Sequence, residues 1–444
     1  LTHEVSVTVF FKRKEIMERI AIIEGVRTPF CKMGTAFNGV SAQELGMIAT
    51  RELLERSGID VDVIDEVIFG NVGQPSDAAN ISRVIALLSG IPKTTPAYTV
   101  HRNCASGIES AVQAVMKIKS DEGDCYVVGG TESMSNISIN LDKTLQDRLM
   151  ALSKAKTLGA KLAGLAQFYP KYFNIQKSLK IGLKLGLTDP TCGLNMGQTA
   201  EVLAKEFGIT RDQQDQFALE SHQKAFAAKE ILREEIVPVM LRPKYKKFIE
   251  EDNGPREKQT IEALAKLKPF FDRRSGTVTA GNSSQITDGA VALLIMTEKR
   301  AKKLGVKPLG FIHSHAFCGV EPQRMGIGPA HAIPTVLKKA KMRLKDIQAV
   351  EINEAFAVQV LACLKALSSD QFSKEFSYSG YTGTIDPAIL NVAGGSIALG
   401  HPVGATGARL ILTMLKHMQR NDLNTGLVSL CVGGGQGAAV VLER

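Results

Sequence analysis

The sequence contains no tryptophan, and only 6% of its residues are aromatic. Its seven cysteines are odd in number, form no Cys-x-x-Cys pair and follow no regular spacing. This pattern argues against a disulfide framework or a zinc site, so we predict no metal ligands and a reducing, cytoplasmic compartment. No apolar run approaches the roughly 18 residues that a bilayer-spanning helix needs.

The composition is otherwise that of a globular protein, with 444 residues, 44% of them hydrophobic and 22% charged. This length is enough for two or three domains with a sizeable core. The net charge of +9 would attract nucleic acid, anionic lipid or a polyphosphate substrate. Because no nucleic-acid-binding motif accompanies the charge, we favour a small anionic substrate and predict no nucleic-acid partner.

The first sixteen residues differ from the rest of the chain. An apolar run at 5–11 precedes Lys12, Arg13 and Lys14, whereas a secretory signal carries its positive charges first. Met17 then opens a regular strand pattern. We therefore expect Met17 to be the natural start and residues 1–16 to be a leader that is non-native or disordered.

Predicted strands and helices alternate at both ends of the chain, which indicates an α/β fold. The first part predicts strands at 19–24, 65–72 and 125–130 and helices at 41–56 and 80–88, with a third helix ending at 119. Ser41 and Gly58 are cap signals of the first helix. The last third repeats this plan, with helices at 332–342 and 404–417 and strands at 346–352, 389–393 and 426–431. We interpret the repeat as two pseudo-symmetric halves.

The segment 136–187 has a helical pattern and is strongly basic, with leucines at intervals of three and four residues. Two interpretations stay open. The segment is either a solvated helical excursion that packs by its leucine face, or a surface that docks on a membrane or a partner.

Cys104 lies in the stretch 100–111, where an extended apolar segment turns into a helix. The N–H groups at a helix N-terminus are unpaired and the helix dipole is positive there. We therefore predict a thiol pushed toward the thiolate, which is the nucleophilic form. The alternative is a buried cysteine that only packs, and it is weakened by candidate partners in distant segments.

Three later turns supply those partners. His401 lies between a glycine and a proline at the equivalent turn of the second half, where a neutral imidazole could accept the thiol proton. Cys431 is a second thiol, and the glycines after it, Gly433 among them, leave backbone N–H groups free for an oxyanion hole. Asn353 ends a strand and could position a water molecule.

These stretches resemble the thiolases, and the match covers nearly everything from Met17 to Arg444. The matching motifs are the Cys104 stretch and those at 129–135, 353–356, 400–402 and 431–435. The resemblance implies two βαβαβαββ halves in a five-layered α-β-α-β-α core with an inserted loop domain, and a homodimer or homotetramer. We expect a first half at 17–136 and about 285–304, an inserted helical domain at 137–284 and a second half at 305–444.

The resemblance also implies reversible Claisen chemistry on coenzyme A thioesters, with CoA as a substrate and no permanently bound cofactor. Cys104 would attack the 3-keto carbon after activation by His401. Cys431 would protonate the acetyl-CoA enolate and then activate a second CoA. His401 and a water on Asn353 would form one oxyanion hole, and the N–H groups of Cys104 and Gly433 the other.

Further substrate contacts rest on the resemblance alone. Ser284 matches the pantetheine-binding serine of the family. The residues that would line the tunnel or lie near the adenine are Met196, Met325, Ala355, Phe356 and Arg256.

The basic segment 136–187 resembles the insertion in the β subunit of the mitochondrial trifunctional fatty-acid oxidation complex. Those subunits usually carry His-Glu-Ala-Phe, whereas this chain has Asn353 at the first position. We expect thiolytic cleavage of 3-ketoacyl-CoA in β-oxidation, with acetoacetyl-CoA formation by an acetyl-CoA acetyltransferase as the alternative. The segment could dock on a β-oxidation partner or a membrane surface. A purely structural subunit is disfavoured because both thiols and the histidine are present, and Cys431 disfavours a decarboxylating ketoacyl synthase.

Overall fold

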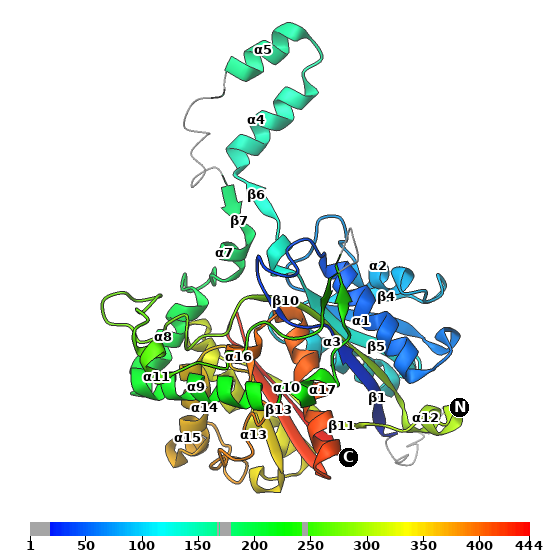
Figure 1. The fold of residues 1–444 in the computed structure, drawn as a ribbon, viewed down its shortest axis with the longest axis vertical. Helices are drawn as coiled ribbons and strands as arrows, with labels where there is room; N and C mark the ends of the chain where they lie inside the picture. Colours follow the sequence, from blue (N-terminus) through cyan, green and yellow to red (C-terminus); the bar gives the residue numbers. More distant parts are fainter. Residues whose placement is uncertain (1–17, 167, 169–178, 242–246) are drawn as a thin grey trace, which may run out of the picture.

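The computed structural model describes residues 18–166, 168, 179–241 and 247–444. The centre of this part of the chain is a ten-stranded sheet with helices on both sides (Figure 1). Its strands are β1 (Ile20–Arg27), β2 (Cys31–Lys32), β3 (Glu66–Gly70), β4 (Ala97–Val100), β5 (Cys125–Glu132), β10 (Thr287–Thr297), β11 (Gly310–Gly319), β12 (Ala349–Ile352), β13 (Thr425–Val432) and β14 (Gln436–Glu443). They follow the order β12-β13-β14-β11-β1-β10-β5-β3-β4, and β2 pairs with β10 off this path.

The sheet consists of two halves with the same plan. In the first half, β3 is parallel to β4 and β5, and β10 lies antiparallel between β5 and β1. In the second half, β12 is parallel to β13, and β14 lies antiparallel between β13 and β11. The pairs Ala21–Phe311 and Ile22–Gly310 join β1 to β11. The predicted two-half plan is therefore confirmed, with the halves joined at a narrow seam.

Helices form three layers around these half-sheets. Two of them, α1 (Ala42–Ser57) and α2 (Ile81–Leu88), cover the first half-sheet, and α13 (Gly328–Ala340) covers the second. Next to α13, α14 (Ala357–Leu367) shares the hydrophobic core of that half-sheet. Between the half-sheets lie α3 (Ser106–Lys119) and α17 (Val403–Arg420), and α17 contacts both β5 and β13. A Cβ atom at Gly107 would lie 2.5 Å from the backbone nitrogen of Ala408, so the two central helices touch through their backbones. The predicted α-β-α-β-α order is confirmed.

A long, mainly helical region connects β5 to β10. Its elements are β6 (Ile139–Leu141), α4 (Lys143–Lys154), α5 (Leu158–Ala166), β7 (Leu179–Ile181), α7 (Gly182–Gly186), α8 (Met196–Glu206), α9 (Arg211–Ala227), α10 (Lys229–Arg233), β8 (Val239–Met240), β9 (Phe248–Ile249) and α11 (Ile261–Ala265). The remaining helices are α12 (Glu298–Leu304), α15 (Asp370–Glu375) and α16 (Ser396–Leu399). Short 3-10 turns span Val61–Val63, Met134–Asn136, Pro322–Ile327 and Leu344–Asp346. The domain boundaries at 136, 284 and 304 stay a prediction.

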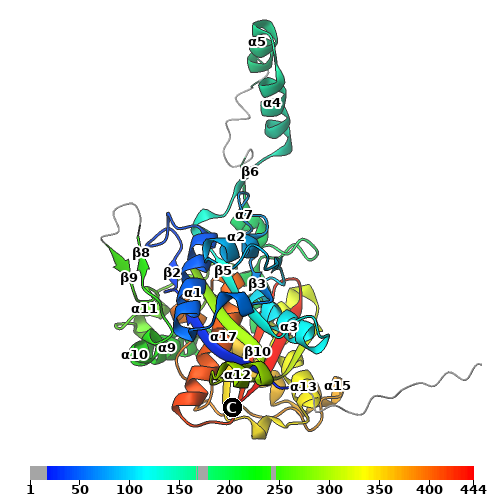
Figure 2. The same cartoon turned by 90° about the vertical axis from the view of Figure 1, so that its right-hand side faces the viewer.

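The elements β6, α4, α5 and β7, which we call the antenna, project away from the body in both views (Figure 1 and Figure 2). Neither α4 nor α5 contains a buried residue. Leu158 and Leu162 are 75% and 59% exposed, so the leucine stripe does not pack against the body. The stem is the antiparallel pair β6–β7, which the helical pattern of the sequence did not predict.

The cap signals of the first predicted helix are confirmed, because Ser41 accepts from the backbone N–H of Glu44 and Gly58 closes α1 with a φ of 61°. The predicted strand at 389–393 is wrong. Leu390 forms a single bridge to Val350, and the positive φ of 46° at Asn391 turns the chain away. Residues 1–16 lie outside the described residues. No helix in the described part is long and apolar enough to cross a membrane.

Candidate active site

Cys104 sits in the turn between β4 and α3, and the turn is held by hydrogen bonds to its neighbours. Asn103 has a φ of 42°, a conformation that asparagine tolerates better than most residues. Its side-chain amide donates to the carbonyl oxygen of Gly433 over 2.7 Å, which ties the Cys104 turn to the turn after β13. Ser106 Oγ accepts from the N–H of Arg102 at 2.9 Å and donates to the carbonyl of Asn103 at 2.7 Å.

The sulfur of Cys104 faces backbone donors from both turns. Burial raises the pKa of its thiol, and hydrogen bonds from the N–H groups of Gly433 and Cys104 lower it without offsetting the burial. The charge of Glu132 raises it further. The predicted shift toward the thiolate is therefore wrong, because removing the sulfur from water outweighs the helix N-terminus. The resting side chain is a neutral thiol.

His401 is the middle residue of the short loop between α16 and α17 and is 7% exposed. Its Nδ1 lies 2.7 Å from Oγ1 of Thr406, and that hydroxyl donates to the carbonyl of Pro402 at 3.1 Å. A hydroxyl has one proton to give, so Nδ1 must donate and Nε2 must be the free acceptor. Nε2 is buried and has no hydrogen-bond partner among the described residues. Burial, followed by the charge of Arg409, lowers the pKa of His401 to about 3, so the imidazole is neutral.

Cys431 and Asn353 lie at the ends of neighbouring parallel strands, β13 and β12. Cys431 is 1% exposed, and burial first and the Cys104 sulfur second raise its thiol pKa. Asn353 donates its N–H to Ser429 at 2.9 Å and accepts from Ser396 Oγ at 2.6 Å. Its side-chain nitrogen is buried without a partner in the described chain, as His401 Nε2 is. Both atoms are free to bind a further polar group.

A cavity of about 420 Å³ opens at the Cys104 turn. Cys104, Gly433 and Met196 line it together with Val403, the first residue of α17. Its outer wall comes from the base of the antenna and from α7, and the apolar residues there are Ile137, Leu183, Leu185 and Leu187. Of the predicted catalytic side chains, Cys104 lines this cavity, whereas His401, Cys431 and Asn353 do not. Their chain neighbours Val403 and Gly433 do.

The other predicted substrate contacts lie in two places. Met325, Ala355 and Phe356 belong to the hydrophobic core around Cys431, and Met196 packs against that core. The N–H of Ser284 donates to the carbonyl of Ala355 over 2.9 Å, but neither residue lines the 420 Å³ cavity. Arg256 is exposed, and its side chain donates to Gln259 over 3.2 Å. The structure thus brings Ser284 and Ala355 together and leaves Arg256 apart from the cavity.

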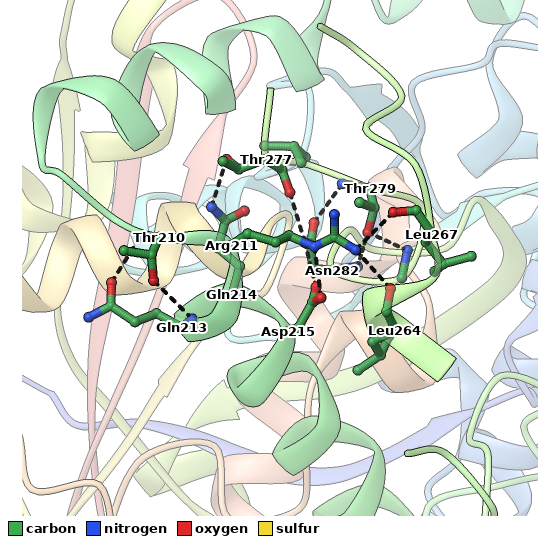
Figure 3. A network of polar contacts seen from close by, with 12 residues as sticks. Thr210, Arg211, Gln213, Gln214, Asp215, Leu264, Leu267, Thr277, Thr279 and Asn282 are labelled. Carbon is green, nitrogen blue, oxygen red and sulfur yellow. Dashed lines mark hydrogen bonds and ion pairs between the residues drawn. The ribbon is translucent and has the colours of Figure 1, made fainter. Parts of the chain in front are cut away.

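A polar network on α9 fixes the loop that precedes Ser284, and the sequence did not predict it (Figure 3). Arg211 donates to Asp215 over 2.7 Å, and Asp215 accepts from the side-chain amide of Asn282 over 2.9 Å. The carbonyl of Asn282 accepts from the N–H of Ala357 at 2.9 Å. The network therefore places Ser284 beside the start of α14.

The sequence interpretation also missed Thr406, which selects the tautomer of His401. A hydroxyl five residues after the histidine, one turn into the following helix, is the signal that could have identified it.

A layered α/β core with two neighbouring thiols, a neutral buried imidazole and backbone N–H donors is typical of enzymes that act through a cysteine nucleophile. A family model described as "Thiolase, N-terminal domain" matches residues 20–299, and "Thiolase, C-terminal domain" matches residues 306–444. The chain belongs to the thiolase family.

Relatives and solved structures match almost the full chain. The 3-ketoacyl-CoA thiolases of Pectobacterium carotovorum and Shewanella amazonensis are each 42% identical, over 96% of this chain and 97% of theirs. The acetyl-CoA acetyltransferase of Bacillus anthracis superposes with a TM-score of 0.83 at 36% identity, covering 96% of this chain and 99% of that one. Human mitochondrial 3-ketoacyl-CoA thiolase in complex with CoA superposes with a TM-score of 0.81 at 34% identity, covering 96% and 98%.

Proposed function

We propose that the protein cleaves 3-ketoacyl-CoA with a second CoA, giving acetyl-CoA and a shortened acyl-CoA. The observation that carries this proposal is the pairing of Cys104 with a second buried thiol, Cys431. The neutral His401 lies two residues before Val403, which lines the same cavity as Cys104. A cysteine hydrolase needs one thiol, whereas a thiolase needs a nucleophile and a separate group that handles the enolate proton. The names of the 42% identical relatives support the same reaction.

In the first step, His401 Nε2 accepts the Cys104 proton as the sulfur attacks the 3-keto carbon. The N–H groups of Cys104 and Gly433 stabilise the oxyanion that forms on the 3-keto oxygen. The imidazolium of His401 and a water held at the side-chain nitrogen of Asn353 stabilise the enolate oxygen of the leaving acetyl-CoA. The carbon–carbon bond then breaks, and Cys431 protonates the carbanion of the leaving acetyl-CoA. A well-placed oxyanion donor is worth about 3–4 kcal/mol of barrier.

In the second step, Cys431 takes the thiol proton of a new CoA, and the CoA sulfur attacks the acyl group on Cys104. The N–H groups of Cys104 and Gly433, which face the sulfur, stabilise this second oxyanion. The acyl–Cys104 bond then breaks, and His401 returns its proton to the Cys104 sulfur. CoA is a substrate in this scheme, and no permanent cofactor takes part. We place the pantetheine arm against Ser284, with Met196, Met325, Ala355 and Phe356 along its path and Arg256 near the adenine.

Condensation of two acetyl-CoA molecules to acetoacetyl-CoA is the second candidate, because the same two thiols and histidine would catalyse the reverse reaction. The Bacillus anthracis neighbour carries that name. Cleavage of longer substrates is favoured by the apolar residues of the 420 Å³ cavity wall, which a two-carbon acyl group would leave unused. Relative kcat/KM on acetoacetyl-CoA and on a long-chain 3-ketoacyl-CoA separates the two candidates.

Mass spectrometry after mixing with acetyl-CoA tests the assignment of the two thiols. Acetylation of Cys104 alone is expected, since Cys431 does not form a covalent intermediate. Cys104→Ala should abolish the adduct, whereas Cys431→Ala should still acetylate and stall before the carbon–carbon bond step. An adduct on any cysteine other than Cys104 would refute the assignment.

We also propose a cytoplasmic homodimer or homotetramer that docks on an anionic membrane surface, or on a β-oxidation partner, through the antenna. The exposed lysines of the antenna and its exposed leucines support this. Lys154, Lys156 and Lys161 lie on or between α4 and α5, beside the exposed Leu158 and Leu162. Lys171 and Lys177, which add to the basic pattern of the sequence, lie outside the described residues.

A further inference from the structure

Glu132, the last residue of β5, is completely buried and has no role in the reaction scheme above. It forms no ion pair with a described residue that would account for its place in the core. It lies close enough to Cys104 for its charge to raise the thiol pKa. A buried carboxylate beside a nucleophilic thiol opposes thiolate formation, so its presence calls for a compensating role.

Four N–H groups from two distant segments surround this carboxylate. Oε1 accepts from the N–H of Gly73 at 2.8 Å and from the side-chain amide of Asn71 at 3.2 Å. Oε2 accepts from the N–H of Val72 at 3.1 Å and from the N–H of Gly404 at 3.0 Å. Each oxygen thus accepts two hydrogen bonds, and the ionised carboxylate, which only accepts, fits this arrangement.

The two segments that Glu132 joins both belong to the site. Val72 and Gly73 line the same cavity as Cys104 and Gly433. The N–H of Asn71 donates to the carbonyl of Val100 at the end of β4, four residues before the nucleophile. Gly404 lies in the first turn of α17, three residues after His401. One side chain therefore connects the Cys104 turn, the cavity wall and the helix that directly follows the His401 loop.

We propose that Glu132 is a positioning residue of the thiolase reaction, which as a carboxylate ties the 71–73 turn to the first turn of α17 and so fixes His401 relative to Cys104. The proposal rests on the function proposed above. Glu132 does not touch the reacting atoms. The negative charge of Glu132 also disfavours the Cys104 thiolate, so the proton stays on the Cys104 sulfur until His401 removes it.

Glu132→Gln separates these two effects. A glutamine side chain has one oxygen and one NH₂ group, so its NH₂ group must face two N–H donors and cannot bond to them. The link between the 71–73 turn and α17 is therefore broken on one side, and kcat for thiolysis should fall about 10- to 100-fold. The lost negative charge should at the same time lower the pH midpoint of Cys104 alkylation by iodoacetamide, by about one pH unit. A slower enzyme with a more reactive thiol is a combination that simple loosening of the fold does not produce.

Two other titratable groups interact with Cys104 or Glu132, and the Glu132→Gln substitution leaves both unchanged. Cys431 on β13 interacts electrostatically with Cys104, and Asp288 on β10 faces Glu132. Burial raises the pKa of Glu132 to about 7 although its backbone donors lower it, so the alkylation series should extend above pH 8, where the carboxylate is charged. Below about pH 6, where the carboxylate is protonated, the alkylation rates of the two proteins should converge.

Glu354→Gln is the matched control. Glu354 is also a buried carboxylate, 1% exposed, and it accepts from Ser221, Asn391 and the N–H of Ile397. Its loss should lower the unfolding temperature without moving the alkylation midpoint. If Glu132→Gln does not fold, Glu132→Asp keeps the charge but shortens the link, and should lower kcat with the midpoint unchanged.

Unchanged kcat in either Glu132 variant, or an unmoved midpoint in a folded Glu132→Gln, would overturn the proposal. If instead the wild-type protein shows no thiolysis while the midpoint still differs between wild type and Glu132→Gln, the proposed function fails and the electrostatic contact stands.

Discussion

Burial sets the resting protonation states at the site. It raises the thiol pKa of both Cys104 and Cys431 and lowers the pKa of His401 to about 3. Neutral thiols and a neutral imidazole make a stable resting state, since none of these three side chains holds a charge away from water. Proton transfer from Cys104 to His401 creates an ion pair there. It becomes favourable only as the sulfur bonds to the substrate and the negative charge passes to an oxygen that the N–H groups of Cys104 and Gly433 stabilise. The thiolate of Cys104 therefore forms only as it attacks bound substrate.

Gly400 fixes the direction of His401. Its φ is 99°, and a Cβ atom there would lie 2.2 Å from Cγ2 of Thr287. Gly400→Ala must shift the histidine loop, so kcat for thiolysis should fall about 100-fold. Gly34→Ala is the matched control, because Gly34 has a φ of 75° but no atom within 4 Å of the added Cβ. Equal turnover in the two variants would contradict this account.

His331 should contribute a pH dependence to stability without touching the site. It packs against Phe372 and Phe376, and burial, followed by Arg324, lowers its pKa from 6.5 to about 4. The folded state thus resists protonation that the unfolded chain accepts below pH 6.5. Its contribution to stability is complete above pH 6.5 and is lost as the pH falls toward 4.

In His331→Phe, the loss of unfolding free energy between pH 7 and pH 4 should shrink by about 3 kcal/mol, measured by urea unfolding. Phe372→Leu disturbs the same cluster without removing a titratable group and should keep the wild-type pH dependence. A His331→Phe curve parallel to that of the wild type would show that the histidine does not titrate as argued.

At the scale of single residues, the sequence predicts which chemical groups are present but not their charge states. Cys104, His401 and Cys431 stand in turns marked by glycine and proline, which are local signals. The pKa of Cys104 depends on burial and on Glu132, and both follow from packing between segments distant in sequence. For the same reason the direction predicted for that pKa was wrong.

At the scale of elements, caps and periodicity predict helices well, whereas strand pairing depends on contacts that the chain makes at long range. The caps of α1 are local and were predicted, but the β6–β7 stem joins residues 38 or more positions apart along the chain. The antenna shows the same distinction. Its leucine stripe predicts a helix, but several of these leucines, Leu158 and Leu162 among them, are exposed. Figure 2 shows that α4 and α5 project away from the body, so only the two helices can pack on each other.

The antenna should bind anionic vesicles in a salt-sensitive way. Each lysine near an anionic surface contributes about 1 kcal/mol, so the triple variant Lys154→Glu, Lys156→Glu and Lys161→Glu should weaken binding about 100-fold in co-sedimentation at low salt. Reversing three exposed lysines around α12, at 302, 303 and 307, changes the net charge equally and should have little effect. Equal loss in both variants would indicate attraction by net charge, and no salt-sensitive binding by the wild type would remove the membrane proposal.

At the scale of the whole molecule, the two halves share their central layer. The sheet seam consists of two residue pairs, so it contributes little by itself. The halves are joined instead by α17, which packs on β5 and β13, and by a buried ionic link. Thr413 on α17 and Arg27 on β1 both donate to Glu235, at 3.0 and 3.1 Å. Repetition in the sequence predicted the two halves, but not that one helix would serve both.

This sharing predicts that the halves unfold as one cooperative unit. Leu410 is a buried residue of α17, and Leu410→Ala should cost about 2–5 kcal/mol. Because α17 supports both half-sheets, amide protons of β5 and β13 should lose equal protection in native-state hydrogen exchange. Leu53→Ala, a matched change in the outer helix α1, provides the sharper test, since α1 covers only the first half-sheet. If the halves are one unit, it also lowers protection equally in β5 and β13. Loss confined to β5 would show that the halves unfold separately.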